Sequence, residues 1–403
     1  AANSSSGAGI ASVKLHEALL SENVKSKILF LNDQSNEVPH NYFYQNTIAR
    51  KIKRIFLTFV DRFIIKFYLR RKKEIFSPGL FGIDLSQEYE VQNADIIHLH
   101  WINHGFIDIK DLSKLNKPIV WTLHDCWVFT GGCHHFFSCE NFKNNCGTCP
   151  VLKSENNNDL SNYVFRRKQK HLPMSNIKYV AISSWMKKQA KLGSLLRNEL
   201  IELIPSGIDC SIYNYDSNSD IRTRFNLKKE DSIVLMGAQH INSPYKGVQL
   251  SVDALNKYNK KLIVITFGNG EIILSNKLHK VISFGFVSDA KEMANLYKAA
   301  DVFLCTSIVE GFGMTVAESQ CSGTPAIAFE ETGPSDIITH KSTGYLAKFK
   351  DTDDVLKGLS YCLNSKFDKK KISMEAEIKF SINNCAIKYN SIYKQILSVE
   401  RKK

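Results

Sequence analysis

The sequence predicts an α/β protein with two doubly wound parallel-sheet domains. Short apolar runs of strand-forming residues alternate with helical segments, and turns rich in glycine or polar residues follow the carboxyl ends of these runs. The same pattern occurs on both sides of residues 203–209, a segment that contains proline and glycine. Strands buried on both faces of a parallel sheet have this continuous apolar character. The chain of 403 residues is long enough for about two to three domains.

The composition is that of a globular protein, with 43% hydrophobic and 23% charged residues. The chain has no apolar run long enough to span a membrane, so no spanning helix is expected. It begins with Ala1 rather than with Met, at the apparent end of a strand, so we expect that N-terminal residues are missing. No secretory signal is visible.

The predicted strands come in two series. The first half is expected to contain strands at residues 27–31, 95–101, 119–125 and 178–182. The second half is expected to contain strands at residues 232–236, 262–267, 281–284, 301–305 and 325–329. Ligands of open parallel sheets bind outside the carboxyl ends of the strands. The loops that follow these runs are therefore the candidate ligand-binding positions.

Residues 307–318 form the most informative of these loops. A predicted strand precedes them and a predicted helix begins at Met314, with Gly311 and Gly313 in the turn. Glycine lets backbone N–H groups approach an anion closely, and a helix N-terminus favours negative charge. Glu310 and Glu318 are too far apart to act on one bond, but they suit the two ends of a long ligand such as a nucleotide sugar. The alternative is a capped, charged helix start.

Two further loops in the first half carry candidate ligand groups. Residues 4–9 are rich in serine and glycine and precede a helix, which is typical either of a phosphate cradle or of a simple turn with a helix cap. His124 follows one predicted strand and His100 ends another. A histidine at such a position is more often structural than chemical.

A cysteine cluster lies between residues 133 and 149. In a chain without a secretory signal, such a cluster favours a metal over disulfides, and four thiolates suit structural zinc. Two disulfides or free thiols stay open as alternatives. The first spacing is longer than usual, so His134 is an alternative to one cysteine. Four protein ligands would leave no open catalytic position. The proposed ligands are Cys133, Cys139, Cys146 and Cys149.

The net charge of +13 is concentrated in residues 48–74, where basic residues flank an apolar stripe. This pattern is typical of a helix that lies on an anionic membrane. The alternative is a packed helix whose basic residues are solvated. Nucleic-acid binding is disfavoured, because no nucleic-acid module pattern accompanies the charge.

The sequence resembles the family 4 retaining glycosyltransferases. Glu310 and Glu318 match that family's E-x7-E pattern, with Gly-Phe-Gly inside it. The run Trp-Thr-Leu-His-Asp-Cys-Trp from Trp121, followed by the cysteines and Pro150, resembles a bacterial subgroup from surface-polysaccharide gene clusters. Lys246-Gly247 also matches the family, but Ala238-Gln239-His240 stands where many members have an arginine, which puts one phosphate contact in doubt.

The resemblance implies the GT-B fold, in which two Rossmann-like domains face a cleft. It places an acceptor-side domain at residues 1–206, a nucleotide-sugar domain at residues 207–379, and a helix at residues 380–403 that crosses back to the first. It assigns catalytic positions to Glu310, Lys246 and His124. It assigns donor binding to Gly7, Gly9, Gly311, Phe312, Gly313, Met314, Thr315, Glu318 and Val287.

The resemblance implies transfer of a sugar, with retention, from a nucleoside diphosphate sugar to a growing glycan, carried on a lipid in the expected case. The expected location is the cytoplasm, at the inner face of the plasma membrane, and no catalytic divalent metal is expected. Asp351 and Asp353 match a D-x-D metal motif but are predicted to begin a helix, so we reject them as a site. The rival functions are a nucleotide-sugar epimerase on the same fold and a zinc-containing nucleic-acid-binding protein.

Overall fold

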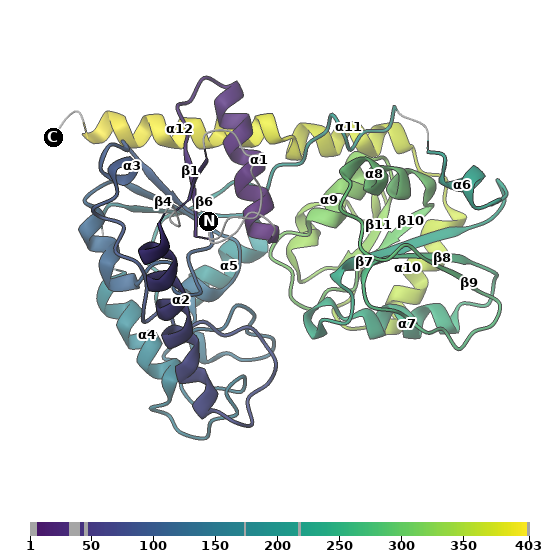
Figure 1. The fold of residues 1–403 in the computed structure, drawn as a ribbon. Coiled ribbons are helices and arrows are strands. Elements are labelled where there is room, and N and C mark those ends of the chain that lie inside the picture. The colour runs from purple at the N-terminus through teal and green to yellow at the C-terminus, as the bar shows by residue number, and fades with distance from the viewer. Residues whose placement is uncertain (1–5, 32–40, 44–46, 173–174, 217–218, 401–403) are drawn as a thin grey trace. The chain divides into compact units, whose positions relative to one another are not determined.

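A computed structural model of the chain describes residues 6–31, 41–43, 47–172, 175–216 and 219–400 (Figure 1). Contacts divide the chain into two units, residues 1–204 with 385–403 and residues 205–384. The sequence predicted a division after residue 206 and a returning segment from residue 380. Every helix in the described part of the chain is too short or too polar to cross a bilayer.

The first unit is built on a four-stranded parallel sheet with the strand order β3-β4-β5-β6. A separate two-stranded parallel sheet pairs β1 with β2. The strands are β1 (Ile28–Phe30), β2 (Asn41–Phe43), β3 (Ile97–Leu99), β4 (Ile119–Leu123), β5 (Ile177–Ala181) and β6 (Ile201–Leu203). The helices are α1 (Gly7–Ser21), α2 (Ile48–Phe63), α3 (Tyr89–Gln92), α4 (Leu160–His171) and α5 (Ser184–Leu192), with short 3-10 helices η1 (Ile64–Phe67), η2 (Ile109–Leu115), η3 (Trp127–Phe129) and η4 (Asn141–Lys143).

The last helix, α12 (Ile382–Glu400), contacts the four-stranded sheet through two tyrosines in its middle part. The Tyr393 hydroxyl lies 2.7 Å from His98 Nδ1, and the Tyr389 hydroxyl lies 2.7 Å from Thr122 Oγ1. These two tyrosines thus hold α12 in the first unit through polar contacts with side chains of β3 and β4.

The second unit is a six-stranded parallel sheet with the order β12-β11-β10-β7-β8-β9. Helices α7 and α10 cover one face, and α8 and α9 cover the other (Figure 1). The strands are β7 (Ile233–His240), β8 (Ile263–Asn269), β9 (Lys280–Ser283), β10 (Val302–Leu304), β11 (Ala326–Phe329) and β12 (Gly344–Ala347). The helices are α6 (Ile221–Arg224), α7 (Val248–Lys257), α8 (Ala290–Ala299), α9 (Met314–Cys321), α10 (Thr352–Asn364) and α11 (Lys369–Phe380), with η5 (Pro244–Lys246) and η6 (Gly333–Asp336).

The strand order reverses between β7 and β10, which are neighbours in space although β8 and β9 lie between them in the sequence. This is the topological switch point of a doubly wound sheet, where ligands bind at the carboxyl edge. The apolar run of β7 explains its central position, since Ile233, Val234 and Leu235 are fully buried. These two parallel-sheet units confirm the predicted fold class.

Two elements differ from the prediction. β7 extends to His240 rather than ending at residue 236, because its polar end pairs with Asn269 of β8 across an irregular register. Pairing with a neighbouring strand overrides the polar pattern there. The loop expected at residues 4–9 is partly helical, because Ser6 caps α1 by accepting a hydrogen bond from the Gly9 N–H at 3.1 Å. Residues 1–5 lie outside the described residues.

Candidate functional site

The carboxyl edge of the six-stranded sheet brings two loops together at the switch point. Residues 244–247 follow β7, and residues 305–313 follow β10. The Tyr245 carbonyl accepts hydrogen bonds from the N–H groups of Ile308 at 2.7 Å and Val309 at 3.3 Å. Gly247 has φ of 57°, and a Cβ there would lie 2.3 Å from the Thr306 carbonyl oxygen. Only glycine permits this close approach of the two loops.

Lys246 and Glu310 form an ion pair at this point, with Nζ 2.6 Å from Oε2. Their side chains are only 21% and 17% exposed, so solvent screens the pair weakly. The Ser307 hydroxyl donates a further hydrogen bond to the same carboxylate oxygen at 3.1 Å. Burial opposes the charge of Lys246, but the Glu310 carboxylate outweighs burial, and the pKa of Lys246 is raised. Lys246 therefore stays cationic throughout the physiological range.

The turn after Glu310 is held in one conformation by glycines. Gly313 caps α9 with φ of 99°, and a Cβ there would lie 2.7 Å from Pro334 Cγ. The Gly333 N–H donates to the Glu310 carbonyl at 2.9 Å. The first N–H groups of α9, at Met314 and Thr315, belong to the helix end that has no intrahelical acceptors and favours negative charge.

Among the predicted donor-binding residues of this turn, Phe312 directs its side chain into the protein core. Its side chain is 2% exposed and packs edge-on against Phe380, with ring centroids 5.6 Å apart. The ring belongs to the core of the second unit, so only the backbone of Phe312 can take part in ligand binding.

Glu318 lies on α9 beside two tyrosines that the sequence analysis did not identify. Tyr297 of α8 donates its hydroxyl to Glu318 Oε2 at 3.1 Å. Burial, and then the nearby Glu318 carboxylate, raises the pKa of Tyr297 and that of Tyr213. Both hydroxyls therefore stay protonated as donors. Neither tyrosine belongs to a local motif. The packing of α8 against α9 brings Tyr297 to Glu318, and the segment between β6 and α6 supplies Tyr213.

The remaining predicted donor positions of the second unit lie at the same sheet edge. Val287 is half-buried in the loop between β9 and α8. Gln239 and His240, which replace the expected arginine, are exposed at the carboxyl end of β7. The rejected D-x-D motif is a helix start, because Asp351 caps α10 and Asp353 pairs with Lys257 at 2.7 Å.

In the first unit, His124 and His100 lie together at the carboxyl ends of the neighbouring strands β4 and β3. His124 Nε2 is 2.8 Å from His100 Nδ1. Burial lowers the pKa of His124 to about 4 and that of His98, on β3, to about 3. These imidazoles are therefore neutral at pH 7 and offer hydrogen bonds rather than charge. Gly7 and Gly9 lie in the first turn of α1.

His134 belongs to a buried polar network rather than to the cysteines. Its Nδ1 lies 2.6 Å from Asp125 Oδ2, and its Nε2 lies 2.8 Å from the Ser77 hydroxyl. The Trp101 indole N–H also donates to Asp125 at 2.9 Å. Both ring nitrogens of His134 are engaged in this network, and its role as an alternative to a cysteine ligand stays a prediction. Ser77 is 1% exposed, so this network is buried in the first unit.

The cysteine cluster brings Cys133 Sγ within 3.9 Å of Cys149 Sγ. Cys146 Sγ accepts a hydrogen bond from the Gly131 N–H at 3.1 Å. The hydrogen bond from Cys133 lowers the pKa of Cys149 to about 7, whereas burial raises the pKa of Cys146 to about 12. Among the described residues, no three His, Cys, Asp or Glu side chains are arranged to hold one metal ion. Structural zinc on these four cysteines, Cys139 included, stays a prediction.

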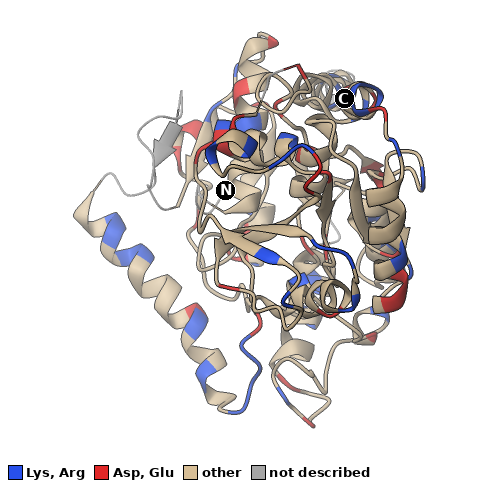
Figure 2. Cartoon of the chain, turned by 90° about the vertical axis from the view of Figure 1, so that its right-hand side faces the viewer, with Lys and Arg blue, Asp and Glu red and all other residues tan. Residues whose placement is uncertain are grey.

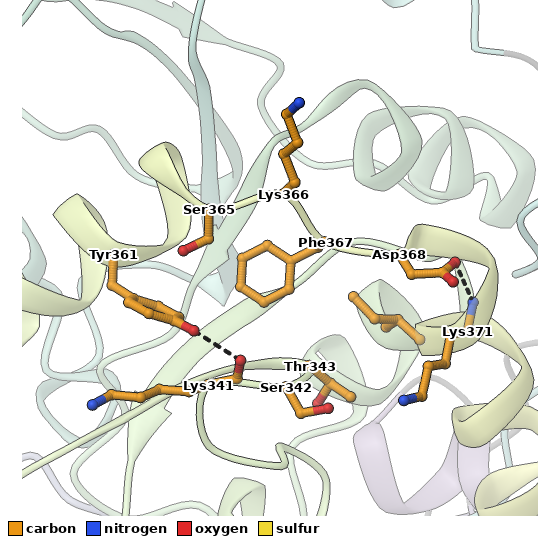
Figure 3. Close-up of a pocket in the computed structure, with 10 residues that line it drawn as sticks. Lys341, Ser342, Thr343, Tyr361, Ser365, Lys366, Phe367, Asp368 and Lys371 are labelled. Carbon is orange, nitrogen blue, oxygen red and sulfur yellow. Dashed lines mark hydrogen bonds between the residues drawn. The ribbon is translucent and has the colours of Figure 1, made fainter.

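A surface pocket of about 150 Å³ lies at the opposite edge of the six-stranded sheet (Figure 3). Residues 341–343, which precede β12, line it together with residues after α10. The Tyr361 hydroxyl donates to the Lys341 carbonyl at 2.9 Å, which ties its two walls together. It lies at the amino ends of the strands, so it is separate from the site of Lys246 and Glu310.

Residues 217–379 match the family model described as glycosyl transferases group 1. An uncharacterized glycosyltransferase of Methanocaldococcus jannaschii is 22% identical over 78% of this chain and 77% of its own length. An O-antigen biosynthesis glycosyltransferase of Escherichia coli is 24% identical over 48% of this chain and 55% of its own. The structure of Anabaena HepE, in complex with UDP and glucose, superposes with a TM-score of 0.64 at 15% identity, covering 97% of this chain and 96% of that one.

Proposed function

Because the chain belongs to the group 1 glycosyltransferases, retaining enzymes of family 4 with the GT-B fold, we propose that it transfers a sugar from a uridine diphosphate sugar to a lipid-linked glycan of a bacterial surface polysaccharide. Transfer from a nucleotide sugar is the activity of the family. The uridine base and the polysaccharide acceptor are the parts that we propose. The single observation that supports the site most strongly is the Lys246–Glu310 ion pair at the switch point.

The proposed site suits a diphosphate. Lys246 is a mostly buried cation, and the N-terminus of α9 directs N–H groups and a positive dipole end to the same edge of the sheet. Its backbone donors come from Gly311, Gly313, Met314 and Thr315. Together these groups would stabilise the negative charge that grows on the leaving diphosphate, which is where fixed donors lower the barrier most.

In the proposed reaction, the bond between the anomeric carbon and the diphosphate oxygen breaks as the acceptor hydroxyl bonds to that carbon on the same face. The hydroxyl proton passes to the leaving phosphate oxygen, so no separate protein base is required. Glu310 would orient the sugar through its hydroxyl groups. The ion pair with Lys246 and the hydrogen bond from Ser307 hold its carboxylate in place for this role.

Glu318 would accept hydrogen bonds from the ribose hydroxyls at the other end of the donor. Tyr297 orients its carboxylate by donating to Oε2. Val287 would border the base. From the resemblance, we further propose that His124 contacts the donor sugar as a neutral hydrogen-bonding group and that Gly7 and Gly9 lie near the diphosphate.

The proposed location is the cytoplasmic face of the plasma membrane, where a lipid-linked acceptor would be available. The O-antigen biosynthesis relative supports a surface glycan as the acceptor class. We expect no catalytic metal, because Lys246 and the α9 amides supply positive potential at the diphosphate. Nucleic acid is not a proposed partner.

A thermal-shift series tests the donor. UDP and UDP-sugars should raise the melting temperature more than GDP and GDP-sugars, because a ligand that binds only the folded state stabilises it. Glu318→Gln should weaken binding of UDP and UDP-sugar equally, whereas Glu310→Gln should weaken only binding of the UDP-sugar. A larger shift with GDP-sugars would refute the uridine proposal and leave the activity class intact.

Product analysis without acceptor separates the alternative function. A nucleotide-sugar epimerase would convert the donor to its epimer in the absence of any acceptor. The proposed transferase should release UDP rapidly only when an acceptor glycan is added. Formation of the epimer without acceptor would overturn the proposal.

A further inference from the structure

The helix α2 turns its apolar face outward, whereas an ordinary surface helix turns its polar face outward. Its exposed side chains include Ile48 at 80%, Ile52 at 61%, Phe56 at 63%, Phe59 at 55% and Phe63 at 42% exposure. Successive residues turn by about 100° around a helix, so these side chains and that of Ile55 fall within an arc of about 100°. A helix of a globular protein normally turns such a stripe toward the core.

The face that α2 turns toward its own unit is largely polar. Asp61 is fully buried and accepts hydrogen bonds from the backbone N–H groups of Leu80 at 2.8 Å and Phe81 at 3.3 Å. The Thr58 hydroxyl donates to the His104 carbonyl at 3.0 Å. A Cβ on Gly105 would lie 2.8 Å from Thr58 Cα, so the backbones are in close contact. These contacts fix α2 with its apolar stripe outward.

The stripe continues beyond the helix. The rings of Phe59, Phe63 and Phe67 follow one another with centroid distances of 5.4 and 5.6 Å. Phe67 is 73% exposed and Leu69 is 92% exposed, while Ile65, which precedes both, is buried and anchors the segment in the first unit. The apolar surface therefore extends through η1.

Basic side chains border this stripe. In Figure 2, α2 is the helix at the lower left, with basic positions distributed along its ribbon. Lys51 and Arg62 lie at one border of the stripe and Lys53 at the other, by the same rotation of about 100° per residue. All three are exposed, as are Lys66 within η1 and the basic residues that follow it, namely Arg70, Arg71, Lys72 and Lys73. Asp61 is the single acidic residue between 48 and 73, and it is buried.

We propose that the outward face of α2 and η1 docks on an anionic lipid bilayer, with the isoleucine and phenylalanine side chains in the acyl boundary and the lysines and arginines at the headgroups. An apolar stripe with basic borders matches the two attractions that hold a helix in that interface. Docking would bring the enzyme to the membrane that holds a lipid-linked acceptor. The proposal rests on the proposed function only in taking the acceptor to be lipid-linked.

Co-sedimentation with vesicles tests the docking without any use of activity. The full chain should bind vesicles of phosphatidylcholine with about one third anionic phosphatidylglycerol and bind pure phosphatidylcholine much more weakly. Neutralising Lys51 and Lys53 to Gln should weaken partitioning by about fivefold for each charge. The triple variant Ile52→Ser, Phe56→Ser and Phe59→Ser should weaken it by at least about tenfold, because it removes the buried apolar area.

A matched variant provides the control. Ile273→Ser, Leu278→Ser and Ile378→Ser also remove three exposed apolar side chains, at 84%, 55% and 70% exposure, but from the second unit. This variant should bind vesicles as the unmodified chain does. Equal binding by both triple variants, or equal binding to neutral and anionic vesicles, would overturn the proposal.

Two measurements separate the other outcomes. Light scattering without lipid measures whether the chain associates with itself through this face. We expect no self-association that the α2 triple variant abolishes. Self-association through this face without vesicle binding would assign the face to a second copy of the chain and overturn the bilayer proposal. The thermal shift with UDP should be the same in the α2 variant and its control, which shows that both are folded. Loss of vesicle binding with an intact UDP response supports the docking, whereas failure of the UDP response in the unmodified chain would refute only the proposed donor.

Discussion

Replacing Lys246 by alanine removes the cation whose Nζ lies 2.6 Å from Oε2 of the Glu310 carboxylate. The substitution leaves the backbone of the loop in place, because the contacts that hold it come from the Tyr245 carbonyl and Gly247. Glu310 keeps its hydrogen bond from Ser307 at 3.1 Å. The change is therefore confined to one positive charge at the proposed diphosphate position.

The expected magnitude follows from burial and charge state. The Lys246 side chain is 21% exposed and its pKa is raised, so the charge is present at pH 7 and screened little. Loss of one such donor to a developing anion costs about 10²–10³ in turnover, roughly 3 kcal/mol. A lysine whose pKa is higher in the folded state stabilises the fold fully at any pH below its pKa in the unfolded chain, about 10.4. This stabilisation is lost only as the pH rises above that value. The stability effect is thus constant across pH 5–9, at about 1–3 kcal/mol.

Single-turnover kinetics at saturating donor and acceptor measures the effect on the chemical step, and chemical denaturation measures stability. Lys257→Ala is the matched control, since Lys257 pairs with Asp353 at 2.7 Å in the same unit but both side chains are more than half exposed. It should leave turnover unchanged and cost at most about 1 kcal/mol. A Lys246→Ala turnover within threefold of the unmodified enzyme would refute the assignment of Lys246 to the leaving group.

Three further predictions concern other parts of the chain. His124→Asn should lower turnover, and the unmodified enzyme should show no inflection near pH 6.5 in its pH–rate profile, because the pKa of His124 is about 4; an inflection there that His124→Asn removes would contradict this. Gly313→Ala should lower the free energy of unfolding by about 1–3 kcal/mol and weaken UDP binding. The backbone at this position has φ of 99°, and the added Cβ would contact Pro334. Chemical denaturation measures the first effect and thermal shift with UDP the second. Elemental analysis of protein purified without added metal should find about one zinc per chain, lost on Cys146→Ser; a metal-free, equally stable protein would rule out the zinc site.

Much of the sheet architecture was predictable, because strands buried on both faces must be continuous apolar runs. The runs at β4, β5, β10 and β11 were recognisable for this reason. The end of β7 was not, since Gln239 and His240 are polar and extend the strand only by pairing with β8. The start of α1 was misplaced because the cap formed by Ser6 satisfies the Gly9 N–H and extends the helix toward the N-terminus.

The sequence by itself determined the local chemistry of the candidate site: a glycine turn after a buried strand, a carboxylate on each side of it, and a Lys-Gly pair after an earlier strand. Only the tertiary structure decided that Lys246 pairs with Glu310, that Tyr297 holds Glu318, and that the apolar stripe of α2 faces outward. The physical reason is that local patterns specify which groups a segment carries, whereas partners from distant segments are set by strand order and by the packing of whole elements. Periodicity describes a helix face but not the side on which the rest of the protein lies.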